Sequence, residues 1–328
     1  MELFKPIFAN LTGEQRTPDK GFNPAIAQLF SKAWSAAFLK RILHSNPFDW
    51  LCTKNETGVA VDSLETALAA IGAIRRRGHH KIVIKEALGL AGSNAVRLFE
   101  PEILETHRRW IANAVENHRQ LVVEPWLERV LDFSVQLEMT PDGLKLCGYT
   151  GLLNDAKGQF QGNVALPGHQ KKIPADLIAL FPEPPDIAQR LHSLYADIFA
   201  LLEEELRRAN YLGPAGIDAF AYRDAEGKIR LKPVVEINPR YTMGRVMVEL
   251  MKHVAPGSRG EFRLVSRKQI LAEGFTDFMA FATSMTERFP IRLKGEPSPR
   301  ISEGALCLNE PVRARVCLAV FQVARQSG

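Results

Sequence analysis

Cysteine is scarce in this sequence, and none of it falls in a metal-binding pattern. Cys52, Cys147, Cys307 and Cys317 are isolated, with no CxxC pair and no histidine at metal-ligand spacing, which argues against a zinc site. The sequence also lacks a signal-peptide pattern and an apolar run long enough to cross a membrane. We therefore expect a cytoplasmic protein with reduced thiols and no membrane partner.

Charge of one sign is not concentrated anywhere along the chain. The net charge is +5 and the isoelectric point is near 9.0, but the basic runs at 75–77 and 171–172 are short and carry no interleaved aromatic residues. Such runs do not form a nucleic-acid track, so we expect no nucleic-acid partner. With 46% hydrophobic and 24% charged residues, the 328-residue chain has the composition of an ordinary globular protein.

What the sequence does contain is a compact cluster of carboxylate and amide residues. Two apolar, β-branched runs, 217–222 and 229–237, are separated by a segment with the composition of a hairpin turn. This hairpin is expected to bring Asp218 opposite Glu236. Because alternate side chains on a strand share a face, Glu236 and Asn238 are expected to point the same way.

Three oxygen ligands arranged in this way indicate a magnesium site. An all-oxygen set with one amide suits Mg²⁺, which keeps waters and takes further ligands from substrate phosphates. Arg240 follows Asn238 closely and supplies a fork-shaped donor for phosphate oxygens. The alternative is a structural salt bridge between Glu236 and Arg240, which leaves Asp218 without a role. We predict metal ligation by Asp218, Glu236 and Asn238.

A lysine followed by small residues forms a second motif. Residues 82–84 predict a short strand, Lys85 follows it, and the next loop contains Gly89, Gly92 and Ser93. Small residues let backbone N–H groups approach phosphate oxygens closely, and a lysine adds a point charge. An ordinary turn is the alternative interpretation of this loop.

The third motif lies in residues 121–139. An apolar strand ends at Glu124, a connector runs through Trp126 and Leu127, and Asp132 opens a second strand with alternating apolar and polar residues. Packing in the core is an alternative role for Trp126.

In this order the three motifs resemble the nucleotide site of the ATP-grasp superfamily, as found in carboxylate–amine ligases such as D-alanyl-D-alanine ligase and biotin carboxylase. The resemblance covers about residues 30–250. It implies an α+β, ATP-grasp fold in which two α+β subdomains hold ATP between antiparallel sheets. Residues 1–30 would be an extension or the remnant of a missing or much reduced N-terminal pre-ATP-grasp domain. Residues 31–140 would form the lid part and 141–328 the part with the metal site.

The resemblance also implies roles for individual residues at the phosphates. Lys85 and Arg240 would be the catalytic residues, acting on the phosphates of ATP. Gly89, Gly92 and Ser93 would close over these phosphates. Lys32, which opens a predicted helix, would contact the nucleotide as well, although a surface helix lysine is the alternative.

At the other end of the nucleotide, the resemblance assigns the base and the sugar. The backbone from Glu124 through Trp126 to Leu127 would pair with the edge of adenine. Asp132 would take the ribose hydroxyls. Glu128 is the rival for this role, because the connector is longer than the common pattern.

The implied activity is ATP-dependent ligation with Mg²⁺, or alternatively Mn²⁺, as the cofactor. A small-molecule or peptide carboxylate would become an acyl phosphate and then react with an amine or a thiol. A phosphotransferase acting on a hydroxyl and a non-catalytic nucleotide-binding subunit are the alternatives. A homodimer, or a partner subunit that supplies the N-terminal domain, would be compatible with the short N-terminus.

The remaining sequence predicts elements without assigned chemistry. Helices are expected over 63–77, 101–118, 186–209, 243–253 and 267–288, a loop over 150–185, and a strand pair at 305–308 and 316–323. Asp62 and Glu65 have the spacing of a capping box at the first of these helices. In the loop, His169, Lys171 and Lys172 would bind an anionic substrate or form solvated surface.

Overall fold

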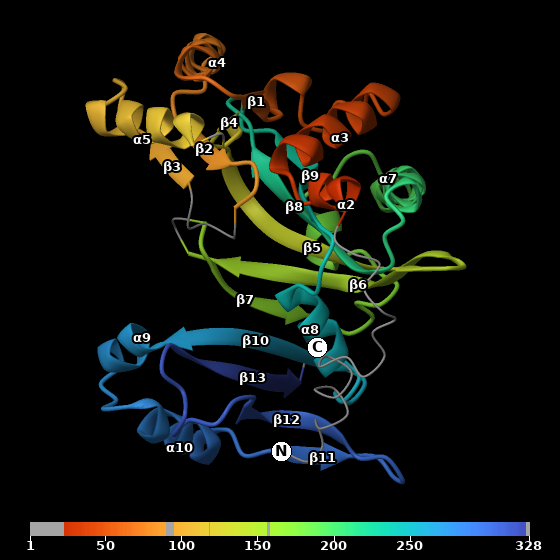
Figure 1. The fold of residues 1–328 in the computed structure, drawn as a ribbon. Coiled ribbons are helices and arrows are strands. Elements are labelled where there is room, and N and C mark those ends of the chain that lie inside the picture. Colours follow the sequence, from red (N-terminus) through yellow and green to blue (C-terminus); the bar gives the residue numbers. More distant parts are fainter. Residues whose placement is uncertain (1–22, 90–94, 118, 156–157, 326–328) are drawn as a thin grey trace. The chain divides into compact units, whose positions relative to one another are not determined.

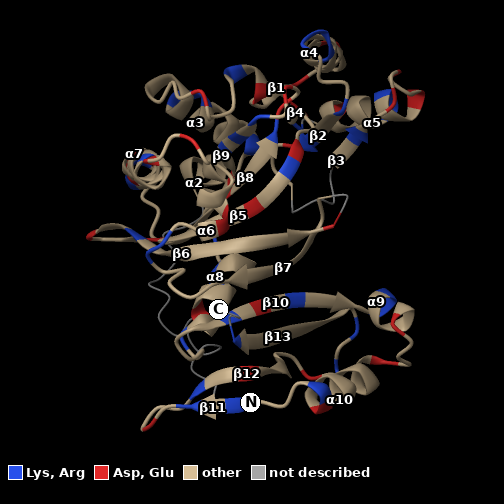
Figure 2. Ribbon diagram, turned by 180° about the vertical axis from the view of Figure 1, so that it is seen from behind, with Lys and Arg blue, Asp and Glu red and all other residues tan. Residues whose placement is uncertain are grey.

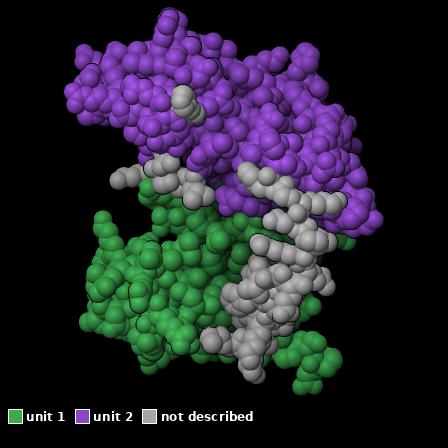
Figure 3. Space-filling model, in the orientation of Figure 1, with its two compact units in different colours: residues 1–22, 146–174, 241–328 green, residues 23–145, 175–240 purple. Residues whose placement is uncertain are grey.

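The computed structural model describes residues 23–89, 95–117, 119–155 and 158–325 (Figure 1). Within it the chain forms two compact units, each built from segments that are far apart in the sequence (Figure 3). The described part of one unit comprises 146–174 and 241–325, and the other comprises 23–145 and 175–240. We call the second the nucleotide unit, because all the predicted nucleotide and metal residues belong to it. Of these, Gly92 and Ser93 lie outside the described residues.

The nucleotide unit contains an antiparallel sheet of four short strands in the order β1-β4-β2-β3. The strands are β1 (Val59–Val61), β2 (Ile82–Glu86), β3 (Ala95–Leu98) and β4 (Leu121–Pro125). Their apolar residues pack against α4 (Leu64–Arg76) and α5 (Glu105–Glu116) in one core (Figure 1). The cap of α4 is Ser63 with Thr66 rather than Asp62 with Glu65, because the Ser63 hydroxyl accepts the Thr66 N–H.

Three longer antiparallel strands of the same unit carry the predicted metal residues. They are β5 (Glu128–Thr140), β8 (Gly213–Arg223) and β9 (Ile229–Asn238). The predicted hairpin between β8 and β9 is confirmed, with Asp224 Oδ1 accepting the N–H groups of Glu226 and Lys228. Phe133 and its apolar neighbours on β5 pack against Tyr195 of α7 (Ile187–Arg208), so the polar residues of these strands share the opposite face.

The remaining described elements of the nucleotide unit are α2 (Pro24–Leu29), α3 (Lys32–Ser45), the 3₁₀ turn Lys54–Glu56 and α6 (Ala175–Ala179). Of these, α3 contacts β9, which carries two of the predicted metal ligands, and the Ser35 hydroxyl accepts the Ile237 N–H at 3.0 Å. This contact fixes the start of α3, and therefore Lys32, beside the end of β9.

The other unit is also built on antiparallel strands. In sheet order they are β11 (Arg292–Lys294), β12 (Arg300–Cys307), β13 (Cys317–Arg325), β10 (Ser258–Ser266), β7 (Phe160–Ala165) and β6 (Gly143–Asn154), and the chain enters the unit within β6. The helix α8 (Met243–Met251), capped by Thr242, packs on this sheet. The predicted pair of C-terminal strands is confirmed as β12 and β13.

Two predictions are wrong. The expected loop over 150–185 contains the end of β6, all of β7 and, in the nucleotide unit, α6. Its glycines serve close strand packing, because a Cβ on Gly162 would lie 2.2 Å from the Phe262 carbonyl oxygen. The helix expected over 267–288 is two helices, α9 (Arg267–Ala272) and α10 (Phe278–Arg288). Gly274, with φ of +88°, ends the first.

Surface charge follows the sequence expectation. Basic and acidic residues are interspersed along the elements (Figure 2). Within the described segments, no helix combines the length and the apolarity that crossing a bilayer demands.

Gly58 provides a test of the packing that holds β4 beside α3. A Cβ at this position would lie 2.5 Å from Val122 Cγ1 and 3.3 Å from Ala36 Cβ. We expect Gly58→Ala to lower the free energy of unfolding, measured by urea denaturation, by about 1–3 kcal/mol. The control is Gly72→Ala within α4, where the new Cβ meets only an Arg76 guanidinium nitrogen at 3.3 Å. Because alanine favours helix, this control should raise stability by up to about 1 kcal/mol. Equal effects of the two changes on the free energy of unfolding would contradict close packing at Gly58.

Candidate functional site

Asp218 and Glu236 lie directly opposite each other on β8 and β9, as predicted. Asn238 is two residues beyond Glu236, and its Nδ2 donates to Asp218 Oδ2 at 3.1 Å. Arg240 Nη2 donates to Asn238 Oδ1 at 3.1 Å. The structure therefore brings together all three predicted metal ligands and the predicted phosphate-binding arginine. To share an ion with Asp218, the Asn238 amide would have to rotate so that its oxygen replaces its nitrogen.

The charged form of Asp218 is disfavoured, mainly by burial and also by the charge of Glu236. Burial and the charge of Glu236 raise the pKa of the Asp218 carboxyl to about 6, with a smaller contribution from Asp132, against the opposing effects of the Ser134 hydroxyl and Arg240. A divalent cation between the two carboxylates would favour the charged form. Among the described residues no three His, Cys, Asp or Glu side chains gather into a metal site. An ion here would take two carboxylates, one amide and its remaining ligands from water or phosphate, which suits Mg²⁺.

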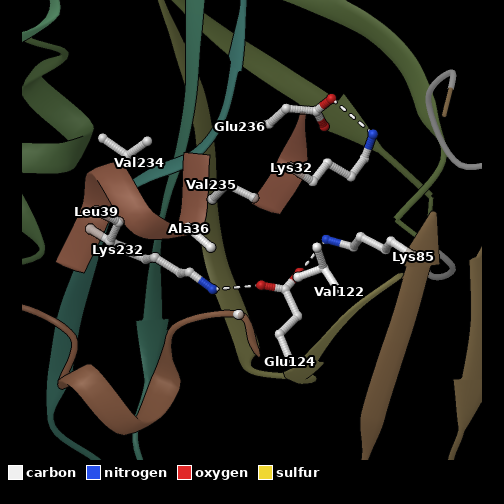
Figure 4. A pocket seen from close by; sticks show the side chains of 11 residues that line it. Lys32, Ala36, Leu39, Lys85, Val122, Glu124, Lys232, Val234, Val235 and Glu236 are labelled. Atoms are coloured by element: carbon white, nitrogen blue, oxygen red, sulfur yellow. Dashed lines mark hydrogen bonds and ion pairs between the residues drawn. The ribbon is translucent and has the colours of Figure 1, made fainter. Parts of the chain in front are cut away.

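Lys32 contacts the same carboxylate cluster from the first turn of α3. Its Nζ lies 3.0 Å from Glu236 Oε1 (Figure 4) and donates to the Gly89 carbonyl oxygen at 2.8 Å. The side chains of Lys32 and Glu236 are only 10% and 23% exposed, so this ion pair is poorly screened by solvent. Lys32 is therefore part of the site and not a surface helix lysine.

Glu124 forms the centre of a buried ion-pair network. Its Oε1 pairs with Lys85 Nζ, and its Oε2 accepts from Lys232 Nζ at 2.8 Å (Figure 4). Burial alone would raise the pKa of Glu124, but Lys232 and Lys85 outweigh it and hold the pKa below its usual range. Burial lowers the pKa of Lys85, and Glu124 opposes this effect. The carboxylate thus holds two lysines from two other strands in place.

Lys232 is a site residue that the sequence analysis missed. It is 2% exposed, and its Nζ also donates to the Glu56 carbonyl oxygen at 3.0 Å. The available signal was a lone lysine inside the apolar run of β9, because a lysine is almost never fully buried without a partner. That partner, Glu124, is 108 residues away in sequence, so no local pattern identifies it.

These charged side chains line one small cavity (Figure 4). Three amines, of Lys32, Lys85 and Lys232, face two carboxylates, of Glu124 and Glu236, so the lining carries an excess positive charge that suits an anion. The enclosed space is about 10 Å³, about the room that one water molecule needs. A phosphate group would therefore fit only after the ion pairs across the cavity separate.

In the hinge between β4 and β5, Trp126 already makes contacts within the protein, whereas the backbone N–H of Leu127 meets no backbone acceptor among the described residues. The Trp126 N–H donates to the Lys81 carbonyl oxygen at 2.9 Å. The half-buried indole of Trp126 has the guanidinium groups of Arg97 and Arg129 over its ring, at 5.4 and 5.5 Å from the centroid. These contacts favour packing, and not base stacking, as the role of this indole.

The pairing of β5 with β8 places Asp132 and Glu128 on opposite faces of the sheet. Asp132 lies opposite Phe220 and Ser134 opposite Asp218, so Asp132 shares a face with the metal residues. Glu128 lies opposite Arg223, is exposed, and points to the other face. The strand register thus favours Asp132 over Glu128 as a residue facing a nucleotide.

The network around Lys232 gives a prediction for stability. Lys232→Met keeps the side-chain length but leaves Glu124 with one lysine and the Glu56 carbonyl without a donor, so we expect a loss of about 2 kcal/mol in the free energy of unfolding. Lys228→Met is the matched control. Lys228 directly precedes the same strand, and its pair with Asp49 is 50% and 82% exposed, so this pair should contribute less than about 1 kcal/mol. Equal losses in urea denaturation would show that burial of the ion pair is unimportant.

The raised pKa of Asp218 predicts a pH-dependent effect of Asp218→Asn. The folded state binds this proton more tightly than the unfolded state, so the wild-type protein loses stability as pH rises from about 3.8 to about 6. Without metal, the variant should therefore be more stable at pH 8, by on the order of 3 kcal/mol, and the difference should vanish near pH 4. Urea denaturation in a chelator at both pH values measures this. A gain that is the same at pH 4 and pH 8 would disprove the charge argument.

Comparison with known proteins rests on structure, since no family model and no curated protein sequence matches the chain. The biotin carboxylase domain of *Hydrogenobacter thermophilus* 2-oxoglutarate carboxylase, solved with MgADP, ADP and bicarbonate, matches with a TM-score of 0.55 and 12% identity over 92% of this chain and 63% of that one. An ADP complex of N5-carboxyaminoimidazole ribonucleotide synthetase matches with a TM-score of 0.54 and 14% identity, over 91% and 68%. Biotin carboxylase from *Campylobacter jejuni* matches with 0.51 and 12%, over 92% and 64%.

The chain thus spans less than two thirds of the length of the first of these structures. At such low identity the similarity concerns the fold. The similarity extends over nine tenths of this chain, and the sheets are antiparallel, as the sequence resemblance implied. This protein has the ATP-grasp fold.

Proposed function

We propose that this protein is an ATP-dependent ligase that activates a carboxylate as an acyl phosphate and joins it to an amine or a thiol. The observation that carries the proposal is the paired carboxylates Asp218 and Glu236, beside a small cavity with an excess of lysine amines. Carboxylates able to hold a metal ion, beside amines able to hold an anion, are what a metal-bound polyphosphate requires. The neighbouring structures with ADP or MgADP add support through their fold.

The chain's own residues would divide the work of holding the nucleotide's phosphates. Asp218, Glu236 and Asn238 would hold Mg²⁺, or alternatively Mn²⁺, which would neutralise phosphate charge when bound. Lys32 now neutralises Glu236; a cation on that carboxylate would release the ammonium group to contact a phosphate. Lys85, held by Glu124, would contact the phosphates from β2, together with the loop that begins at Gly89.

At the other end of the nucleotide, the hinge and β5 would hold the base and the sugar. The Leu127 N–H is available to the adenine edge, because the Trp126 N–H already pairs with Lys81. Asp132 would accept the ribose hydroxyls. Asp132 lies two residues from Ser134, the register partner of Asp218, and two residues of strand span about 6.7 Å. One nucleotide could therefore extend along this face from Asp132 to the metal residues.

The chemical step would depend on positioning and charge neutralisation. A carboxylate oxygen of the acceptor attacks the γ-phosphorus of ATP, and the bond from this phosphorus to the β,γ-bridging oxygen breaks, releasing ADP. The amine then attacks the acyl carbon, phosphate leaves, and the amine nitrogen loses a proton. Arg240, anchored on Asn238 and exposed beyond it, would stabilise charge on the transferring phosphoryl group together with Lys85.

Trapping of the intermediate tests this proposal. With MgATP and hydroxylamine, a screen of amino acids and small carboxylic acids should yield carboxylate-dependent ADP and a hydroxamate. Glu236→Gln should reduce both products by at least about 100-fold, because one charged metal ligand is lost. The control Glu226→Gln, in the exposed turn of the same hairpin, should retain wild-type rates.

The other outcomes of the screen identify the alternatives. ADP formed with a hydroxyl compound and without hydroxamate would indicate a phosphotransferase. If the wild-type protein binds ATP but releases no more ADP than Glu236→Gln with any compound tried, it is a non-catalytic nucleotide-binding subunit. Either outcome would overturn ligation.

A further inference from the structure

A bulge at the start of β5 places an arginine beside Asp132. The register pairs Arg129 with Tyr222 and Asp132 with Phe220, and it shifts by one residue between Arg129 and Leu131. In a regular strand, residues three apart point to opposite faces. The extra residue reverses this alternation, so Arg129 and Asp132 lie on the same face. The inserted residue, Val130, is 40% exposed.

Arg129 is held in one orientation by contacts on several sides. Its Nη1 donates to Asp132 Oδ1 at 3.0 Å. Its guanidinium lies 4.5 Å from the ring centroid of Phe220, which is 4% exposed, and 5.5 Å from that of Trp126. A planar guanidinium stacked on aromatic rings has little freedom to turn. Arg129 and Asp132 are 25% and 16% exposed, so the ion pair is only partly solvated.

The contact leaves half of the Asp132 carboxylate available. Arg129 occupies Oδ1, and Oδ2 accepts no hydrogen bond from the described residues. An ionised carboxylate has about four acceptor positions, so Asp132 can accept two further hydroxyl donors without losing Arg129. Because Arg129 fixes one oxygen, it also fixes the direction in which the other oxygen points.

We propose that Arg129 is a positioning residue that orients Asp132 to accept both ribose hydroxyls and thereby sets a preference for ribonucleotides over 2′-deoxynucleotides. This inference rests on the proposed binding of ATP. Without Arg129 the Asp132 side chain gains rotameric freedom, and its hydrogen bond to the 2′-hydroxyl loses most of its directional advantage. The remaining contacts of the nucleotide do not involve the 2′-hydroxyl and are expected to persist.

The test compares the affinities of MgATP and Mg-2′-deoxy-ATP by calorimetry, without an acceptor. A hydrogen bond to a charged acceptor implies that the wild-type protein binds ATP about 10-fold or more tightly than 2′-deoxy-ATP. Arg129→Gln should reduce this ratio to about 3-fold or less, mainly by lowering the affinity for ATP. Arg129→Lys, which keeps the charge but not the stacked fork, should give an intermediate ratio. Circular dichroism verifies that each variant is folded.

Two controls separate positioning from a general structural role. Asp132→Asn, at the proposed ribose ligand itself, should also reduce the ratio. Arg223→Gln, an exposed arginine paired with Glu128 on the other face, should leave the ratio unchanged. A lower affinity of Arg129→Gln for both nucleotides with the ratio preserved would overturn the inference and leave ATP binding intact, as would a wild-type ratio near one. Failure of the wild-type protein to bind either nucleotide would overturn the proposed function as well.

Discussion

The site depends on the compensation of buried charge around Glu124. This carboxylate from β4 holds Lys85 of β2 on one oxygen and Lys232 of β9 on the other. Removing any one of the three would leave a charge with a poor partner in a place that water scarcely reaches, which is why buried pairs are costly to break. The network therefore fixes the strand that carries the predicted phosphate lysine relative to the strand that carries the predicted metal ligands.

The same principle extends to the end of β9 that carries Glu236 and Asn238. Glu236 is balanced by Lys32, whereas the pKa of Asp218 is raised because burial and Glu236 disfavour its charge. The negative charge of Glu236 is thus balanced by Lys32, whereas that of Asp218 is not fully balanced within the protein. Such an arrangement costs stability in the absence of a ligand and favours a cation that serves both carboxylates, which is typical of functional sites.

The polar residues share one face because the strand register selects it. Asp132, Ser134 and Asp218 lie on the side of the sheet opposite Phe133, whose ring packs against α7. Alternation along β5 was visible in the sequence, and it correctly predicted which residues point together. The bulge at Arg129 was not visible, because an extra residue in a strand depends on the pairing with its neighbour and leaves no signature in the residues themselves.

By itself, the sequence determined the hairpin of β8 and β9 and the meeting of Asp218, Glu236 and Asn238, since both follow from local periodicity and turn composition. The fold followed from the resemblance of the three motifs to those of the ATP-grasp superfamily. Strands rich in glycine and polar residues, such as β7, were mistaken for loops, because the need for glycine at Gly162 comes from a neighbouring strand. Only the tertiary structure decided that Glu124 pairs with Lys232 and that Lys32 reaches Glu236. These partners lie 108 and 204 residues apart in sequence. Which charges pair in the interior depends on how the strands and the helix pack, and this leaves no pattern in the neighbouring residues.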